Sequence, residues 1–331
     1  MAKIRCAIVG LGRIGSLLEE DRLREKPCTH AGAVARNRDC LLVGGCDLDI
    51  EKCKLFTKRW KCPHTYLDIE EMLAETHPDI LHIATPPETH LKIIERTLAY
   101  EVKGIICEKP LAENSQEALK IAKIYSSGRL QILTNHERRY SKDYQIVKKH
   151  VMDHTYGDLL SIYARLYMGQ NMPVDDILLH DGTHMIDIIQ FLISVSLKKL
   201  KIEKLKSQNQ EILIIISRAD RIPVILEIGS GRNHIAFELD LSFSSGRIRI
   251  GNGLYEEYDS GKSPYYEKMN SLIKNAARRP RITGYFTNML KDAVLCARNP
   301  ARIPLSSAQD GYTALSFIDS VKDTEQSDLQ G

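Results

Sequence analysis

The chain has 331 residues, of which 43% are hydrophobic and 27% charged, and its formal net charge at pH 7 is +3. This composition is close to that of an average soluble protein, and it excludes a disordered chain, a collagen and a coiled coil. Its basic residues are scattered, and its most apolar stretches are shorter than the roughly 20 residues that span a bilayer. We therefore expect a soluble, cytoplasmic protein of two domains that binds a small molecule, with no nucleic-acid partner and no membrane partner.

The first part of the chain alternates short apolar runs with segments of helical period, which predicts βαβ units and a parallel sheet. The predicted strands are Ile4–Val9, Leu41–Cys46, Ile80–Ala84, Gly104–Cys107 and Leu130–Thr134. The predicted helices are Ile50–Trp60, Ile69–Glu75, Glu88–Ala99 and Gln116–Tyr125. We assign residues 1–135 to this first, α/β domain.

From residue 136 the pattern changes, and few helices separate the later strands, which predicts an α+β domain over residues 136–331. Its predicted helices are Ser141–Met152, Gly182–Ser194, Gly284–Ala297 and Ser307–Val321. Its predicted strands are Leu160–Leu166, Glu211–Arg218, Pro223–Ile228, His234–Phe243 and Arg247–Ile250. Turns rich in Gly and Ser join these strands, which favours an open and mostly antiparallel sheet. The polar tail Lys322–Gly331 has too few apolar residues to pack.

A glycine-rich turn follows the first predicted strand: Gly10, Leu11, Gly12, Arg13, Ile14 and Gly15. After a strand and at the start of a helix, this G-x-G-x-x-G pattern binds the pyrophosphate of a dinucleotide. Gly10 permits the tight turn, Gly12 leaves room for the pyrophosphate, and Gly15 lets helix and strand approach each other. We therefore predict a Rossmann dinucleotide-binding domain; the alternative is a glycine-rich turn that binds no ligand.

Asp47 closes the second strand, where a carboxylate can accept hydrogen bonds from ribose hydroxyls and repel a 2′-phosphate. This favours NAD, with NADP possible because Lys52 or Lys54 could accommodate a phosphate. Asp47 lies farther from Gly15 than the usual spacing of about 20 residues, so we assume an insertion, most simply at residues 21–30. The alternative is that Asp47 or Asp49 simply caps the next helix.

Lys109 follows the predicted strand Gly104–Cys107, and the carboxyl ends of parallel strands form the crevice where ligands bind. A partly buried lysine in that position can donate a hydrogen bond to a substrate oxygen and assist proton transfer. We therefore predict that Lys109 lies beside the nicotinamide; the alternative is a solvated loop lysine.

A third group of candidates is His180, Asp181 and His184, at the start of an apolar helix. In one continuous helix, the two histidines would share a face. A histidine exchanges protons near neutral pH, which makes His184 the acid/base candidate. The H-x-x-x-H spacing could also bind zinc, but a third ligand is missing, so we predict no metal. The alternative is a capping Asp181 with two histidines in structural roles.

These motifs, together with Thr85, Pro86 and His90, and with Glu108 before Lys109 and Pro110 after it, resemble the Gfo/Idh/MocA family of oxidoreductases. The resemblance spans nearly the whole chain. It implies a Rossmann domain followed by a domain with a large open sheet, bound NAD(P), and hydride transfer at a ring carbon of a sugar, nucleotide-sugar or cyclitol. It also implies a homodimer or homotetramer, because open sheet faces of this kind often pair.

Within this resemblance, Lys109 matches the family's catalytic lysine and His184 its helix histidine. Thr85, Pro86, His90 and Glu108 join the glycine turn and Asp47 as expected cofactor-binding residues. The family commonly has Asp four residues before the histidine, where this chain has His180, so His180 or Asp181 is expected to take over that carboxylate's role. The segment 135–140 resembles the family's passage into the second domain, whose Arg and Tyr residues are expected to line the cleft.

Two other functions fit the same resemblance. The first is a regulator that binds NAD(P) without turnover, and the second is a reductase of a non-sugar substrate such as a tetrapyrrole or a dihydrodiol. The presence of both Lys109 and His184 favours the enzyme that acts on CH–OH groups.

Overall fold

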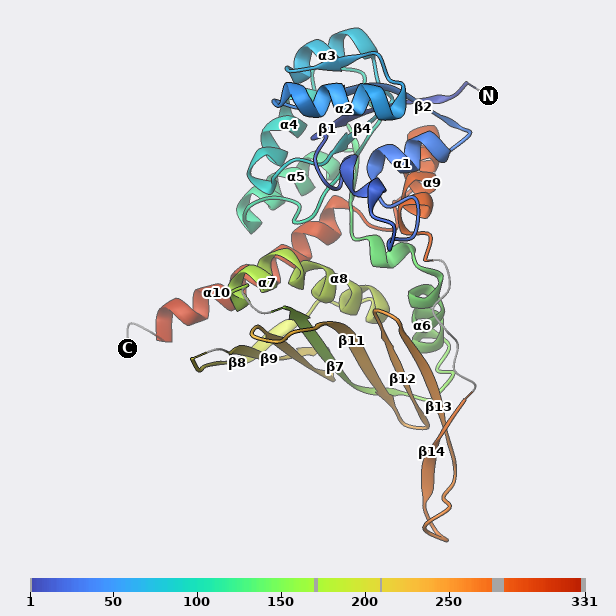
Figure 1. The fold of residues 1–331 in the computed structure, drawn as a ribbon. Helices are drawn as coiled ribbons and strands as arrows, with labels where there is room; N and C mark the ends of the chain where they lie inside the picture. The colour runs from blue at the N-terminus through green and yellow to red at the C-terminus, as the bar shows by residue number, and fades with distance from the viewer. Residues whose placement is uncertain (1, 170–171, 209, 276–282, 329–331) are drawn as a thin grey trace. The chain divides into compact units, whose positions relative to one another are not determined.

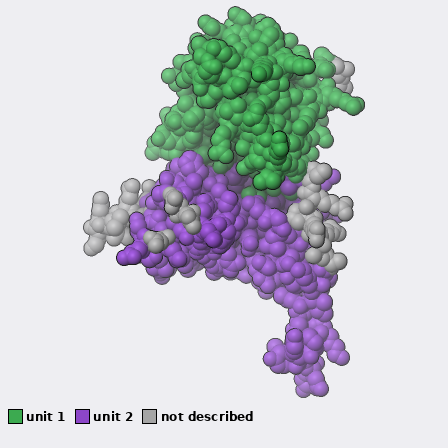
Figure 2. Space-filling view, viewed as in Figure 1, with its two compact units in different colours: residues 1–141, 284–315 green, residues 142–283, 316–331 purple. Residues whose placement is uncertain are grey.

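The computed structural model describes residues 2–169, 172–208, 210–275 and 283–328 (Figure 1). The contacts within the chain divide it into two compact units (Figure 2). The first unit comprises residues 1–141 and 284–315, and the second comprises residues 142–283 and 316–331. No helix in the described residues is long and apolar enough to cross a membrane.

The first unit contains a six-stranded sheet in the order β3-β2-β1-β4-β5-β6, in which every pairing is parallel. The strands are β1 (Ile4–Val9), β2 (Cys40–Cys46), β3 (Thr65–Tyr66), β4 (Ile80–Ile83), β5 (Gly104–Cys107) and β6 (Gln131–Thr134). The helices between them are α1 (His30–Arg36), α2 (Ile50–Trp60), α3 (Ile69–Thr76), α4 (His90–Thr97) and α5 (Ser115–Ser126). Strands β4, β5 and β6 are buried along their whole length, as expected for parallel strands covered on both faces. The predicted Rossmann architecture is thus confirmed.

Local sequence explains where four of these helices begin. A short polar side chain at each N-cap accepts hydrogen bonds from backbone N–H groups of the first turn. These caps are Thr29, Asp49, Asp68 and Asn114.

The first unit also contains α9 (Tyr285–Arg298), from near the end of the chain. Its buried side chains Phe286, Met289 and Leu290 share one hydrophobic core with residues of β1, β4, β5 and β6. The division between the units therefore differs from the predicted domains in two ways. The first unit continues to residue 141, past the predicted boundary at 135, and residues 284–315 return to it. The apolar face of α9 indicated a helix but not which sheet it would cover.

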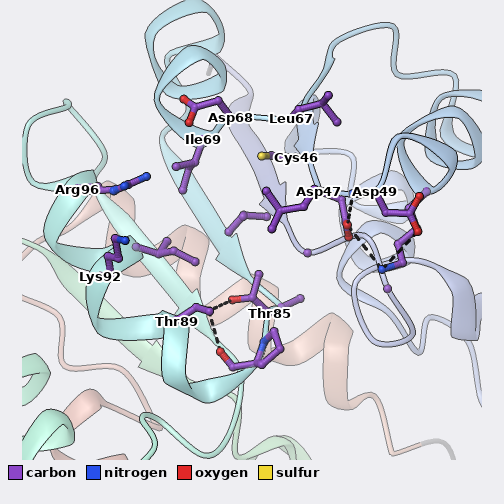
Figure 3. Close-up of a pocket in the computed structure, with 18 of the residues that line it drawn as sticks. Cys46, Asp47, Asp49, Leu67, Asp68, Ile69, Thr85, Thr89, Lys92 and Arg96 are labelled. Atoms are coloured by element: carbon purple, nitrogen blue, oxygen red, sulfur yellow. Dashed lines mark hydrogen bonds and ion pairs between the residues drawn. The ribbon is translucent and has the colours of Figure 1, made fainter.

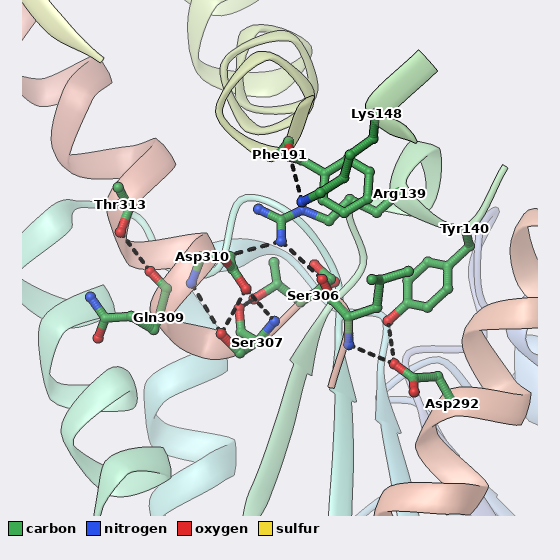
Figure 4. A network of polar contacts seen from close by, with 12 residues as sticks. Arg139, Tyr140, Lys148, Phe191, Asp292, Ser306, Ser307, Gln309, Asp310 and Thr313 are labelled. Carbon is green, nitrogen blue, oxygen red and sulfur yellow. Dashed lines mark hydrogen bonds and ion pairs between the residues drawn. The ribbon is translucent and has the colours of Figure 1, made fainter. Parts of the chain in front are cut away.

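Polar contacts fasten this returning segment to the residues after β6 (Figure 4). Tyr140 donates its hydroxyl hydrogen to Asp292 Oδ2 at 3.2 Å, and Arg139 Nη1 lies 3.1 Å from Asp310 Oδ1. Asp292 Oδ2 also accepts a hydrogen bond from Leu305 N at 2.7 Å. Arg139 and Tyr140 are buried inside the first unit by these contacts, so the expectation that they line a cleft is wrong.

The second unit contains an eight-stranded sheet in the order β14-β13-β12-β11-β7-β10-β9-β8. Its strands are β7 (Leu159–Met168), β8 (Lys198–Lys206), β9 (Glu211–Ala219), β10 (Ile222–Gly229), β11 (Ile235–Phe243), β12 (Gly246–Gly251), β13 (Leu254–Lys262) and β14 (Asn270–Lys274). β7 pairs with β10 in parallel, and the other strand pairings among the described residues of this sheet are antiparallel. The helices α6 (Lys142–Met152), α7 (Val174–His180) and α8 (Gly182–Ile193) lie on one face of the sheet (Figure 1). The predicted open, mostly antiparallel sheet is confirmed.

Three strands of this sheet, β8, β13 and β14, are absent from the prediction. β8 is a lysine-rich edge strand with little apolar alternation, which is how edge strands avoid pairing with other chains. At the chain's end, α10 (Ala308–Asp328) extends beyond the predicted helix Ser307–Val321 into the polar tail Lys322–Gly331, so this helix ends later than the sequence predicts. Residues 329–331 of that tail lie outside the described residues.

Candidate active site

The glycine turn after β1 has the backbone geometry that its sequence predicts. Gly10 has φ +88°, and a Cβ there would lie 2.5 Å from the carbonyl oxygen of Ala84. A Cβ on Gly15 would collide with the carbonyl oxygen of Gly10, so Gly15 closes the turn on itself. A Cβ on Gly12 would meet no atom within 4 Å. Gly10 and Gly15 are therefore required by the fold, whereas Gly12 borders open space.

The segment after the glycine turn differs from the prediction of a helix that begins there. Only a 3-10 helix, Leu17–Glu20, follows the turn, and the first α-helix begins at His30. The residues between them form the expected insertion. Glu19 anchors it, because Glu19 Oε2 accepts hydrogen bonds from Cys28 N at 3.0 Å and from the Thr29 hydroxyl at 2.9 Å.

A cavity of about 990 Å³ lies at the carboxyl ends of β1, β2 and β4 (Figure 3). Five predicted cofactor-binding residues line it: Gly10, Gly12, Asp47, Thr85 and Pro86. Lys52, considered above as a possible phosphate partner, also lines it. The sequence did not predict the other lining residues as cofactor-binding: Val9, Cys46, Leu48, Asp49, Leu67, Asp68, Ile69, Ala84, Glu88, Thr89, Lys92, Ile93 and Arg96. Recognition of the two-residue strand β3 would have pointed to the residues at 67–69, because they follow its carboxyl end.

Asp47 is held at the edge of this cavity by backbone donors. Its Oδ2 accepts a hydrogen bond from Leu11 N in the glycine turn at 2.8 Å, and its Oδ1 accepts one from Asp49 N at 3.0 Å. Lys52 Nζ lies 3.6 Å from Asp47 Oδ1. Asp49, not Asp47, caps α2, since its Oδ1 accepts a hydrogen bond from Glu51 N at 2.9 Å. Asp47 is thus fixed beside the turn, with its carboxylate facing the cavity that it helps to line.

Thr85 and His90 both follow β4, but only Thr85 lies in the wall of the cavity. Thr85 lines the cavity, and its hydroxyl lies 2.7 Å from that of Thr89. His90 is buried, with Nε2 2.9 Å from the Thr85 carbonyl oxygen and Nδ1 3.2 Å from that of Leu111. Burial lowers the pKa of His90, against the opposing effect of these backbone oxygens. His90 therefore ties the loop after β4 to the loop after β5 and does not line the cavity.

The predicted residues Arg13, Ile14, Gly15, Glu108 and Lys109 also do not line this cavity. Glu108 is buried at the carboxyl end of β5, where its Oε1 accepts hydrogen bonds from His30 Nε2 at 2.9 Å and from Asn135 Nδ2 at 2.5 Å. Burial raises the pKa of Glu108, but His30, Asn135 and the charge of Lys109 together hold it below its ordinary value.

Lys109 is half-buried next to this carboxylate. A second carboxyl group, that of Glu137, lies after the neighbouring strand β6. Burial raises the pKa of Glu137, as does the charge of Glu108, while Arg138 and Lys109 oppose the rise. The positive charge of Lys109 thus acts on the carboxyl groups of both Glu108 and Glu137. Glu137 is not among the site residues that the sequence predicts.

The histidine segment belongs to the second unit, and its helix is broken. α7 ends at His180 and α8 begins at Gly182, so the two histidines lie on separate helices and the predicted shared face is wrong. His180 is exposed, whereas His184 is half-buried in the first turn of α8. His184 N donates a hydrogen bond to the Asp181 carbonyl oxygen at 3.1 Å. Among the described residues, no three His, Cys, Asp or Glu side chains are grouped to hold a metal ion.

Comparison with known proteins agrees with a Rossmann domain in the first part of the chain. Residues 4–136 match the Gfo/Idh/MocA oxidoreductase family, whose domain has an NAD-binding Rossmann fold. Inositol 2-dehydrogenase of Rhizobium meliloti is 26% identical over 245 residues, which cover 70% of this chain and 67% of that protein. The chain spans about half (53%) of the length of two further inositol 2-dehydrogenases.

Solved structures show the same fold over the whole chain. A dehydrogenase from Chromobacterium violaceum has a TM-score of 0.81 at 14% identity, with 100% of this chain and 98% of that chain covered. An oxidoreductase from Agrobacterium radiobacter, in complex with NAD+, L-tartaric acid and magnesium, has a TM-score of 0.74 at 15% identity, with coverage of 96% and 95%. Residues 4–136 therefore form an NAD-binding Rossmann domain of the Gfo/Idh/MocA oxidoreductase family.

Proposed function

We propose that this protein is a dehydrogenase that uses NAD to oxidise or reduce a ring carbon of a sugar, nucleotide-sugar or cyclitol. The observation that carries the proposal is the cavity beside the glycine turn, which Asp47 borders and into which Gly12 presents no side chain. Family membership and the relationship to an inositol 2-dehydrogenase support a polyol as the substrate.

The residues present fit a dinucleotide. The open space at Gly12 suits a pyrophosphate against bare backbone, and the Asp47 carboxylate suits the ribose hydroxyls. Thr85 and Pro86 would border the cofactor farther along the cavity. When bound, a nicotinamide cofactor supplies the hydride acceptor or donor, so the protein needs to orient the substrate and handle a proton.

We expect Asp47→Asn to shift the ratio of NADH to NADPH dissociation constants toward NADPH by about tenfold or more. The amide can still accept hydrogen bonds from ribose and from Leu11 N, but it no longer repels a 2′-phosphate. Lys52, 3.6 Å from Asp47 Oδ1, would then be available to attract the phosphate. Titration of both cofactors by fluorescence measures the ratio, and an unchanged ratio would argue against Asp47 as the discriminating residue.

The proton chemistry falls to two side chains in this proposal. Lys109 donates a hydrogen bond to the reacting oxygen and stabilises the negative charge that develops on it, while His184 takes or gives the hydroxyl proton. His180 or Asp181 would hold neighbouring hydroxyls of the substrate. The half-buried state of Lys109 and His184 supports these roles, because both side chains combine solvent access with a fixed environment.

The proposed activity is tested by a screen of sugars, cyclitols and nucleotide-sugars with NAD+ and NADP+, followed through nicotinamide absorbance. We expect turnover of at least one polyol and its loss in the His184→Ala variant. Tight NADH binding without turnover of any compound would instead support a cofactor-binding regulator. Turnover of only hydroxyl-poor aromatic compounds would support a reductase of non-sugar substrates.

We also propose that the protein forms a homodimer or homotetramer through the open face of the second sheet. Tyr163 and Tyr167 lie on this face, and both donate hydrogen bonds to the Glu227 carboxylate at 2.7 Å. Such a preformed aromatic and charged surface suits an interface. Light scattering coupled to size exclusion would report the mass of the assembly.

A further inference from the structure

Four buried polar side chains form a hydrogen-bonded row near the carboxyl end of β5: His82, His30, Glu108 and Asn135. None of the four lines the cavity. His30 of α1 joins the row to β4, since His30 Nδ1 lies 3.0 Å from His82 Nδ1. On its other side, His30 Nε2 lies 2.9 Å from Glu108 Oε1, which Asn135 Nδ2 also contacts at 2.5 Å. The rings of His30 and His82 have no exposed surface, and Glu108 is only 7% exposed.

The geometry constrains where the protons are. The ionised carboxylate of Glu108 only accepts hydrogen bonds, so His30 Nε2 is the donor of that pair. Burial and the neighbouring His30 lower the pKa of His82 well below its ordinary value, so His82 is a neutral imidazole. Of the two facing Nδ1 atoms, one donates and the other accepts. The row of hydrogen bonds therefore runs from His82 through His30 to the Glu108 carboxylate, which His30 and Asn135 hold in place as donors.

Glu108 immediately precedes Lys109 in the chain, and its Oε2 accepts a hydrogen bond from the backbone N–H of Lys109 at 3.4 Å. The charge of Lys109 in turn favours the ionised form of Glu108. A buried carboxylate with two histidines is costly to build where apolar side chains would pack equally well. The other residues of β4, Ile80, Leu81 and Ile83, are all buried and apolar. The polar side chains of His30, His82 and Glu108 at this position therefore indicate a role other than stabilising the fold.

We propose that His30 and His82 are positioning residues, which hold Glu108 and through it set the orientation of Lys109 for reaction. The inference rests on the proposed role of Lys109 in hydride transfer. His30 and His82 touch neither the cavity nor the reacting atoms; they fix the carboxylate that neighbours the lysine. His30 lies at the start of α1, immediately after the insertion, so the same contact also links that helix to β5.

Two substitutions at one position separate the contacts of His30. A glutamine side-chain amide can reach the place of His Nε2, so His30→Gln keeps a donor toward Glu108. An asparagine amide reaches only the place of His Nδ1, so His30→Asn keeps the contact with His82 and loses the one with Glu108. We expect His30→Asn to lower kcat by about 10–100-fold, because small misplacements of a reacting group have effects of this size. We expect His30→Gln to keep kcat close to wild type, and the cofactor KM to stay unchanged in both.

A second measurement does not depend on finding the substrate. Reductive methylation of Lys109, followed by peptide mass spectrometry, reports the environment of its amine. We expect faster methylation in His30→Asn, because the ammonium loses the fixed carboxylate beside it, and a wild-type rate in His30→Gln. Asn135→Ser removes the other donor to Glu108, and it must show the same changes in kcat and methylation if His30→Asn fails to fold.

The outcomes distinguish this inference from the proposed function. Equal losses in His30→Asn and His30→Gln, with equal falls in melting temperature, would show a purely structural role and overturn the inference. Wild-type kcat and methylation in a folded His30→Asn variant would also overturn it. If the unmodified protein turns over no polyol, the proposed function fails, and the methylation rates alone decide whether His30 positions Lys109.

Discussion

Replacement of Lys109 by methionine is expected to lower kcat by about 10²–10⁴-fold, the contribution of a well-placed acid/base group. Methionine keeps most of the length of the side chain but removes the ammonium that would stabilise the developing oxyanion. Because Lys109 does not line the cavity beside the glycine turn, the dissociation constant of NADH should stay close to wild type. Steady-state kinetics with a verified substrate, together with NADH titration, measure the two effects separately.

Strand β5 offers a matched control for this variant. Lys103 precedes the amino end of the same strand, is exposed, and forms an ion pair with Asp79 at 2.6 Å. Lys103→Met removes the same charge beside the same strand, at the end opposite the ligand crevice, so its kcat should match that of the unmodified protein. Wild-type turnover in Lys109→Met, or equal losses in both variants, would reject the role assigned to Lys109.

Local pattern was sufficient for the elements that frame the candidate site. The sequence predicts β1, β5 and α2 with the bounds that the structure has, because short buried runs mark the strands and Asp49 marks the start of the helix. It also predicts the tight turn at Gly10 and the open space at Gly12, since a positive φ and a bare backbone surface are properties of the turn itself. These features depend on residues close together in the chain.

The remaining features depend on contacts between distant segments, which local pattern does not contain. Nothing near His30 or His82 in the sequence indicates that the two rings meet, 52 residues apart. A histidine within the apolar strand Ile80–Ile83 was the available signal, since a buried imidazole needs a partner. In the same way, the apolar face of α9 shows that the helix is packed, but only the fold shows that it completes the core of the first unit.

Two substitutions in the glycine turn should separate cofactor binding from folding. Gly12→Val should leave the melting temperature unchanged, because a Cβ there meets no protein atom within 4 Å. The same side chain would occupy the place of the pyrophosphate, so we expect NADH to bind about 100-fold more weakly or worse, a loss of about 2.7 kcal/mol. Thermal unfolding and NADH titration of the purified variant measure the two quantities.

Gly10→Ala provides the opposite case. Its φ of +88° and the Ala84 carbonyl oxygen 2.5 Å from the new Cβ both oppose a side chain, so we expect a loss of about 1–3 kcal/mol in folding stability. Any weakening of NADH binding in this variant should accompany the fall in melting temperature, whereas in Gly12→Val it should occur alone. If Gly12→Val bound NADH as tightly as the unmodified protein, the open space at Gly12 would not be where the pyrophosphate lies, and the dinucleotide would have to occupy a different part of the cavity.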